Sequence, residues 1–214
     1  MKLIDRVHAG RQLAKKLTAY QDTSAIVLAL PRGGVPIGFE ISQRLNLPLD
    51  VILVRKIGMP GQPEYGLGAV AESDVEILDQ KSMMVFGITK KSLVDTILQE
   101  RAELKRRQRK YRQGRFLPAL KNKTVILVDD GVATGVTMRA AIKFLREKLK
   151  PREIVLALGV CGIDTAAELE QLIDKLVCLN IVPHLHAISQ FYQEFEQTSD
   201  EEVVELLAKS SKLE

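Results

Sequence analysis

The chain has 214 residues, of which 46% are hydrophobic and 27% charged, and its formal net charge is +4 at neutral pH. A chain of this length and composition can form one hydrophobic core that needs no stabilising disulfides or metal ions, so we predict a single domain over residues 1–214. No segment approaches the roughly twenty apolar residues of a membrane span, and residues 1–6 lack the apolar core of a signal peptide, which predicts a cytoplasmic protein without membrane contact.

The first predicted elements are a helix capped by Asp5, a strand and a second helix. Residues 25–30 are uniformly apolar, as in a buried strand of a parallel sheet, and residues 37–45 have helical character. The turn between them contains Pro31, Arg32, Gly33 and Gly34. A glycine turn before a helix suits phosphate binding, and the fork of Arg32 suits phosphate oxygens. Taken alone, the turn is equally consistent with a structural connection.

A third apolar strand is predicted over residues 50–57, and it ends in two cations, Arg55 and Lys56. Neighbouring strand residues point to opposite faces, so we expect one cation to face an anionic ligand and the other a structural partner, unless the strand has already ended. Residues 58–68 are rich in glycine and proline and too long for a simple connector, which predicts a functional loop or lid. A short hairpin or pair of strands is predicted over residues 69–78.

A helix beginning near Thr89 is predicted to end in a basic run over residues 105–115. Cations suit the C-terminal end of a helix, so one interpretation is a solvated helix end. Two others are a contribution to binding a polyanionic ligand and contact with nucleic acid through its phosphates. The acidic residues 200–205, in a predicted helix over residues 200–209, could also pair with this run across a subunit interface.

The most informative segment begins with the apolar strand of residues 125–128, followed by Asp129 and Asp130. Two adjacent carboxylates are costly unless hydroxyl donors, cations or water offset their repulsion, as a ribose diol would. The next residues are small or carry hydroxyls, and a helix is predicted over residues 136–148, so backbone N–H groups could bind a phosphate there. Further strands are predicted at residues 154–158 and 176–181.

Residues 125–137 resemble the phosphoribosyl pyrophosphate (PRPP) signature of type I phosphoribosyltransferases, except that Gly131 replaces a usual aliphatic residue. The resemblance implies that Asp129 and Asp130 bind the ribose 2′ and 3′ hydroxyls, that residues 133–137 hold the 5′-phosphate, and that the turn at Arg32 binds the pyrophosphate. The candidate substrate-binding residues are Arg32, Gly33, Gly34, Arg55, Lys56, Asp129, Asp130, Gly131, Ala133, Thr134, Gly135, Val136 and Thr137, and the catalytic candidates among them are Arg32, Lys56, Asp129 and Asp130.

Strands that alternate with helices predict an α/β architecture with a mostly parallel twisted sheet flanked by helices. The resemblance sharpens this prediction to the type I phosphoribosyltransferase fold, with a core over about residues 25–158 and a small hood built from the chain ends. It implies transfer of a 5-phosphoribosyl group from PRPP to a nitrogenous acceptor with release of pyrophosphate. A homodimer is the expected assembly, because symmetric dimers are common among soluble proteins.

Magnesium is expected to arrive chelated by PRPP, with water-mediated contact to Asp129 or Asp130 left open. His8, His184 and His186 fit no metal pattern, and Cys161 and Cys178 lack C-x-x-C spacing, which favours buried inert thiols. The sequence also lacks the P-loop, dinucleotide-binding and hydrolase-elbow motifs, so those three classes are excluded.

The acceptor stays open at this point. Ala133 stands where enzymes of 6-oxopurine salvage usually carry an acidic residue, which disfavours that acceptor class. The aromatic candidates for stacking on a base are Tyr65, Phe191, Tyr192 and Phe195, and packing roles are favoured for each. The alternative function is a PRPP-sensing regulator that binds RNA or DNA through the basic residues 105–115.

Overall fold

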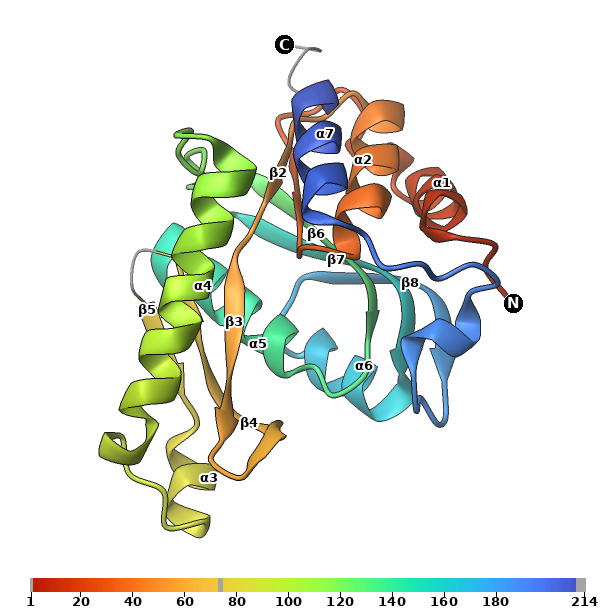
Figure 1. Ribbon diagram of the computed structural model, residues 1–214. Coiled ribbons are helices and arrows are strands. Elements are labelled where there is room, and N and C mark those ends of the chain that lie inside the picture. Colours follow the sequence, from red (N-terminus) through yellow and green to blue (C-terminus); the bar gives the residue numbers. More distant parts are fainter. Residues whose placement is uncertain (1, 73–74, 211–214) are drawn as a thin grey trace.

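A five-stranded parallel sheet forms the centre of the computed structural model, which describes residues 2–72 and 75–210. In spatial order its strands are β2 (Leu49–Val51), β1 (Ile26–Ala29), β6 (Thr124–Val132), β7 (Glu153–Gly162) and β8 (Lys175–Val182) (Figure 1). Strands β1 and β6 pair in parallel with Ile26 opposite Val125, so the turns that follow them emerge at the same edge of the sheet. The parallel sheet confirms the predicted fold class.

Helices cover both faces of this sheet. One face packs against α1 (Arg6–Lys16), α2 (Gly34–Leu45) and α7 (Asp200–Ser210), and the other against α5 (Val136–Phe144) and α6 (Ile163–Glu170) (Figure 1). Each face of the sheet has its own hydrophobic core, and successive residues of β1 point into alternate cores. Val27 packs on the first face and Leu28 on the second, and both are fully buried. Burial on both faces explains why the central strands are continuous apolar runs in the sequence.

A second sheet lies beside the first and is antiparallel, with the order β3 (Val54–Met59), β4 (Gln62–Ala71) and β5 (Val75–Leu78) (Figure 1). Helices α3 (Gln80–Val85) and α4 (Val94–Arg112) follow it. The prediction of one strand over residues 50–57 was wrong, because the segment divides between the two sheets. The hydrogen bonds account for the division: the N–H of Ile52 still donates to Ala29 of β1, whereas the N–H of Leu53 donates to the Glu72 carboxylate at 2.9 Å.

The glycine-rich residues 58–68, predicted to form a loop, instead lie mostly in the β3–β4 hairpin, whose connection is only Pro60 and Gly61. Gly61 has a φ of +79°, a left-handed conformation that favours glycine in a tight turn. Gly66 lets the hairpin pack closely on the first turn of α5, since a Cβ atom there would lie 2.5 Å from Val136 Cγ1. The glycines that pointed to a loop therefore permit a tight hairpin turn and close packing of the hairpin on α5.

Most other predicted elements are present with shifted ends. Strand β6 continues four residues beyond the predicted end at Val128, α4 begins at Val94, after a short 3₁₀ turn, and α5 ends at Phe144 in a π-helical turn. Asp5 caps α1 as predicted, its carboxylate accepting the N–H of His8 at 2.6 Å. Within the described residues, none of the helices combines the length and apolarity that crossing a membrane requires.

Arg112, in the predicted basic run, is 1% exposed and joins the two sheets. Its guanidinium donates to both carboxylate oxygens of Glu72, directly after β4, to Asp50 at 3.2 Å and to the carbonyl of Val51 at 2.6 Å, the latter two in β2. The interpretation of the run as a solvated helix end is therefore wrong at this position. A buried guanidinium with three partners fixes the end of α4 against both sheets.

Replacing Arg112 by Met should lower the free energy of unfolding by about 3–5 kcal/mol, because Glu72 would be left buried without its cation. The matched control is Arg11→Met, which removes an ion pair to Glu40 from a side chain that is 53% exposed and should cost less than about 1 kcal/mol. Urea denaturation of the two variants measures both values. Equal losses would contradict the structural role assigned to Arg112.

Candidate functional site

The two adjacent carboxylates lie near the C-terminal end of β6. Its pairing with β7 joins Asp129 to Leu158 and Gly131 to Val160, so Asp130 lies between two paired positions. Asp129 Oδ1 accepts the N–H of Asp130 at 2.9 Å. Burial raises the pKa of Asp129 well above its usual range, and the charge of Asp130 adds to the rise. The pair is therefore a sheltered acceptor site at the edge where ligands of parallel sheets bind.

Asp130 is held from several sides. Arg6 Nε donates to its Oδ2 at 2.9 Å and Arg6 Nη2 lies 2.8 Å from the same oxygen, while the hydroxyl of Tyr192 donates to the main-chain carbonyl of Asp130 at 2.7 Å. Burial raises the pKa of Asp130, while the Arg6 guanidinium opposes that rise. Arg6 and Tyr192 lie far from Asp130 in the sequence; Arg6 was not among the predicted site residues, and Tyr192 was named only as a candidate for stacking on a base.

The glycine turn after β1 lies directly against these carboxylates. A Cβ atom on Gly33 would lie 2.0 Å from Asp130 Oδ2, and one on Gly34 would lie 2.5 Å from the carbonyl oxygen of Val128. Only glycine permits this approach, which brings the two predicted phosphate-binding segments together. The peptide bond between Pro31 and Arg32 is cis. The Arg32 side chain is turned toward α7, where its Nη1 lies 3.7 Å from Asp200 Oδ1.

The turn between β6 and α5 has the form expected of an anion site. Gly135 has a φ of +72° and precedes the first residue of α5, Val136. The hydroxyl of Thr165 in α6 donates to the carbonyl of Ala133 at 2.8 Å and so fixes the turn. The first N–H groups of a helix have no partner within it, and they carry partial positive charge that suits a phosphate.

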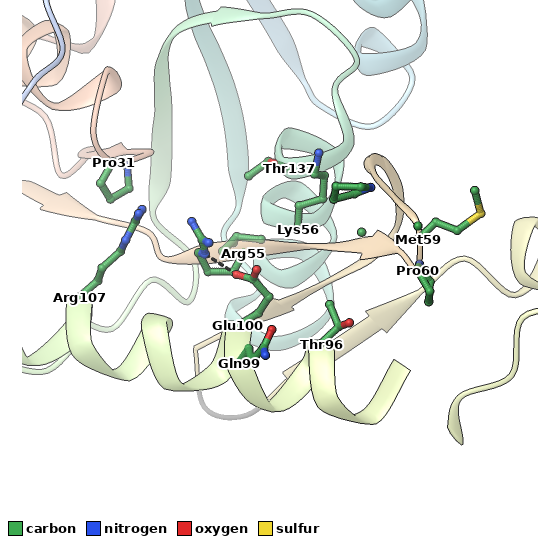
Figure 2. A pocket seen from close by; sticks show the side chains of 14 residues that line it. Pro31, Arg55, Lys56, Met59, Pro60, Thr96, Gln99, Glu100, Arg107 and Thr137 are labelled. Carbon is green, nitrogen blue, oxygen red and sulfur yellow. Dashed lines mark hydrogen bonds and ion pairs between the residues drawn. The ribbon is translucent and has the colours of Figure 1, made fainter. Parts of the chain in front are cut away.

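A cavity of about 660 Å³ adjoins this turn (Figure 2). It is lined by Pro31, Val54, Arg55, Lys56, Gly58, Met59, Pro60, Gly61, Pro63, Thr96, Gln99, Glu100, Arg107 and Thr137. These residues come from the turn after β1, the β3–β4 hairpin, α4 and the first turn of α5. Among them are three cations and one carboxylate, so the cavity suits an anionic ligand.

Arg55 and Lys56 both line this cavity, but they face different partners. Arg55 Nε donates to Glu100 of α4 at 2.6 Å, whereas Lys56 lies on the side of β3 that faces Thr137 (Figure 2). Arg55 therefore has a structural partner in Glu100, and which of the two cations faces a ligand stays a prediction. From α4, Arg107 extends toward Pro31 (Figure 2).

The basic run over residues 105–115 has carboxylate partners within the chain. Asp200, the first residue of α7, accepts from Arg106 Nη1 at 3.0 Å and from the hydroxyl of Tyr111 at 2.5 Å. Lys110 Nζ lies 3.5 Å from Asp200 and 2.7 Å from Glu201. The predicted acid–base pairing thus exists, but within one chain, where the sequence argument had placed it across a subunit interface.

The remaining sequence candidates have structural partners. The Phe195 ring stacks on the Arg6 guanidinium, the ring centroids of Tyr192 and Phe195 are 5.0 Å apart, and Tyr65 packs edge-on against Phe86. Burial raises the pKa of the Cys161 thiol to about 11, as expected for an inert thiol. Across residues 2–72 and 75–210, no group of three or more histidine, cysteine or acidic side chains has the arrangement of a metal site.

Three comparisons bear on the identity of this site. A family model described as "Phosphoribosyl transferase domain" matches residues 4–195. A Mycobacterium tuberculosis protein named "Putative phosphoribosyl transferase Rv0571c" is 39% identical over 208 residues, which are 97% of this chain and 47% of that protein. The chain thus spans about half the length of the curated relatives it matches. The crystal structure of TT1426 from Thermus thermophilus is 36% identical, with a TM-score of 0.84 over 98% of this chain and 99% of that one.

Asp200 should make stability sensitive to acid. Burial alone would raise the pKa of Asp200, but hydrogen bonds from Tyr111 and Arg106 lower it to about 2. Since an unfolded Asp titrates near pH 4, the stabilisation is complete above about pH 4 and is lost as the pH falls through about 2.

We expect Asp200→Asn to cost about 1–2 kcal/mol at pH 7, and the difference from the unaltered protein to shrink between about pH 4 and pH 2. Chemical denaturation of both proteins across this pH range measures it. A difference that does not change with pH would show that the Asp200 charge contributes nothing to the folded state.

Proposed function

The chain belongs to the phosphoribosyl transferase domain family, and on this premise we propose that it transfers a 5-phosphoribosyl group from PRPP to a nitrogenous acceptor with release of pyrophosphate. One observation carries the proposal: the Asp129–Asp130 pair lies between a glycine turn and a helix N-terminus, and these two segments contribute Pro31 and Thr137 to a cavity lined by cations. Carboxylates suit the hydroxyls of a ribose, and the two turns and the cavity suit phosphates at both ends of the same sugar.

In this assignment Asp129 and Asp130 accept hydrogen bonds from the ribose 2′ and 3′ hydroxyls. The 5′-phosphate is bound by residues 133–137, through main-chain N–H groups and the hydroxyls of Thr134 and Thr137. A helix dipole contributes only about 0.3–1 kcal/mol, so the hydrogen bonds supply most of this affinity. The small side chains of the turn allow its backbone to approach the phosphate.

The pyrophosphate is assigned to the cavity. Lys56 and Arg107 line it, Arg55 lines it beside Glu100, and the Arg32–Gly34 turn borders it at Pro31. Binding of a polyanion here would be strengthened by the cations and by removal from bulk water. Arg32 is the residue that has to move in this assignment, because its side chain is turned toward Asp200.

The chemical step follows from where charge develops. As the bond from ribose C1 to pyrophosphate breaks, the sugar gains oxocarbenium character and the leaving group gains negative charge. Lys56 and Arg32 would stabilise the leaving oxygens, while Asp129 and Asp130 would orient the ribose and favour its positive charge. The β3–β4 hairpin, whose turn lines the cavity, is the proposed lid that excludes water from the reacting centre.

The donor set fits magnesium carried by the substrate. Mg²⁺ prefers oxygen ligands and retains water; the carboxylates of the proposed ribose site are those of Asp129 and Asp130, whereas Glu100, which lines the cavity, pairs with Arg55. Oδ2 of Asp130 is engaged by Arg6, so Asp129 is the better candidate for a water-mediated contact. When bound, the metal would neutralise charge on the departing pyrophosphate.

The regulatory alternative has less support in the structure. A nucleic-acid surface needs cations that are available to phosphates, whereas Arg106 and Lys110 pair with acidic residues of α7 and Arg112 is buried. Arg107, which lines the cavity, connects the basic run to the anion site instead. We therefore propose the enzyme and keep the acceptor as the open question.

The test is calorimetric titration with magnesium PRPP, followed by a panel of nitrogenous bases with pyrophosphate release as the readout. Asp129→Asn combined with Asp130→Asn should weaken PRPP binding at least about 100-fold, because two charge-assisted acceptors are lost. The control is Asp22→Asn, on an exposed turn before β1 and therefore at the opposite end of the sheet from the carboxylate pair.

Saturable binding with release for one base would identify the acceptor. Unchanged affinity in a folded double variant would refute the assignment of the ribose site. Absence of PRPP binding by the unaltered protein would refute the proposed function as a whole.

A further inference from the structure

The two ends of the chain meet above the carboxylate pair. The N–H of Leu3 donates to Phe191 at 2.9 Å, and the N–H of Gln193 donates back to Leu3 at 2.8 Å. We call these segments, residues 2–8 and 183–199, the hood. Two hood side chains reach Asp130: Tyr192 bonds its main-chain carbonyl, and Arg6 bonds its carboxylate.

Arg6 is held on three sides, which makes it a rigid support. Its Nε donates to Asp130 Oδ2 and its Nη2 lies 2.8 Å from that oxygen, its Nη1 donates to the carbonyl of Glu196 at 2.6 Å, and its guanidinium carbon lies 3.9 Å from the ring centroid of Phe195. The side chain is 12% exposed. A planar guanidinium fixed in this way restricts both the position and the rotation of the group it binds.

The carboxylate of Asp130 has little freedom on its other side. Oδ2 lies so close to Gly33 that a Cβ atom there would be 2.0 Å away. The oxygen is thus confined between the Arg6 guanidinium and the backbone of the glycine turn. The orientation of the second oxygen follows, because the carboxylate is planar.

We propose that Arg6 is a positioning residue for ribose recognition: it holds the Asp130 carboxylate in the orientation that accepts a ribose hydroxyl, and it acts on the ligand only through that carboxylate. The inference rests on the proposed function, in which Asp130 binds the ribose. It differs from a purely structural role of Arg6 as a link between the hood and β6. A structural link would affect every ligand of the site, whereas a positioning residue affects only ligands that carry the ribose diol.

Three ligands separate these roles: magnesium PRPP, ribose 5-phosphate, which has the sugar but no pyrophosphate, and magnesium pyrophosphate, which has no sugar. In Arg6→Gln we expect affinity for the first two to fall about ten-fold or more, the effect of losing a charge-assisted contact, with affinity for magnesium pyrophosphate within about two-fold of the unaltered protein. Arg6→Lys keeps the positive charge but not the planar guanidinium, so its affinity for magnesium PRPP and ribose 5-phosphate should lie between those of Arg6→Gln and the unaltered protein.

Two controls isolate the effect. Arg11→Gln removes a cation from the same helix, from an exposed pair with Glu40, and should bind all three ligands like the unaltered protein. Tyr192→Phe removes the hydrogen bond to the Asp130 main-chain carbonyl and leaves the carboxylate contact intact. Its affinities for ligands with and without the sugar should therefore differ less than those of Arg6→Gln.

Equal losses for all three ligands, or no loss for ribose 5-phosphate, would overturn the inference while leaving the proposed function intact. If the unaltered protein binds neither PRPP nor ribose 5-phosphate, the proposed function falls and the inference falls with it. If Arg6→Gln does not fold in a denaturation control, Arg6→Lys decides: weaker ribose 5-phosphate with unchanged pyrophosphate supports the inference, and unchanged ribose 5-phosphate overturns it.

Discussion

Two neighbouring carboxylates at the buried end of a parallel strand are the constraint around which the site is organised. Burial and mutual repulsion both oppose their ionised forms. The chain offsets this with the guanidinium of Arg6 and with the N–H of Asp130, which donates to Asp129. Two glycines leave room for this arrangement. A side chain at Gly33 would collide with the Asp130 carboxylate, and one at Gly159 would collide with the Tyr192 hydroxyl, which donates to the Asp130 carbonyl.

Local pairing of opposite charges also determines the environment of the cations on the basic helix α4. In the sequence its cations form one uniform run, but the structure divides them among different tasks. Arg112 is buried between the sheets, Arg106 and Lys110 bind acidic residues at the start of α7, and Arg107 lines the cavity. Arg107 also pairs with Glu103 at 2.7 Å, so each of these four cations has a carboxylate partner within the chain.

Much of the parallel core could be predicted from the sequence, because strands buried on both faces must be uniformly apolar. The strand–turn–helix segments that bring Asp129, Asp130 and the Gly33 turn together were recognisable for the same reason. The β3–β4 hairpin was not, since its glycines allow close packing rather than a loop. The break between β2 and β3 depends on the Glu72 carboxylate, which lies 19 residues from its partner Leu53.

The contact between Arg6 and Asp130 could not be predicted from local sequence patterns, since 124 residues separate the two. Nothing near Arg6 in the sequence distinguishes it from Arg11 on the same helix, and only the fold assigns them different environments. Through Arg6 and Tyr192, the packing of the hood is connected to the side chain and the main chain of one site residue. A ligand that binds Asp130 more tightly when the hood is ordered would be thermodynamically linked to the order of the hood, and such a linkage is reciprocal. Under the proposed function, contacts that an acceptor makes with the hood would in turn strengthen the hold on the ribose.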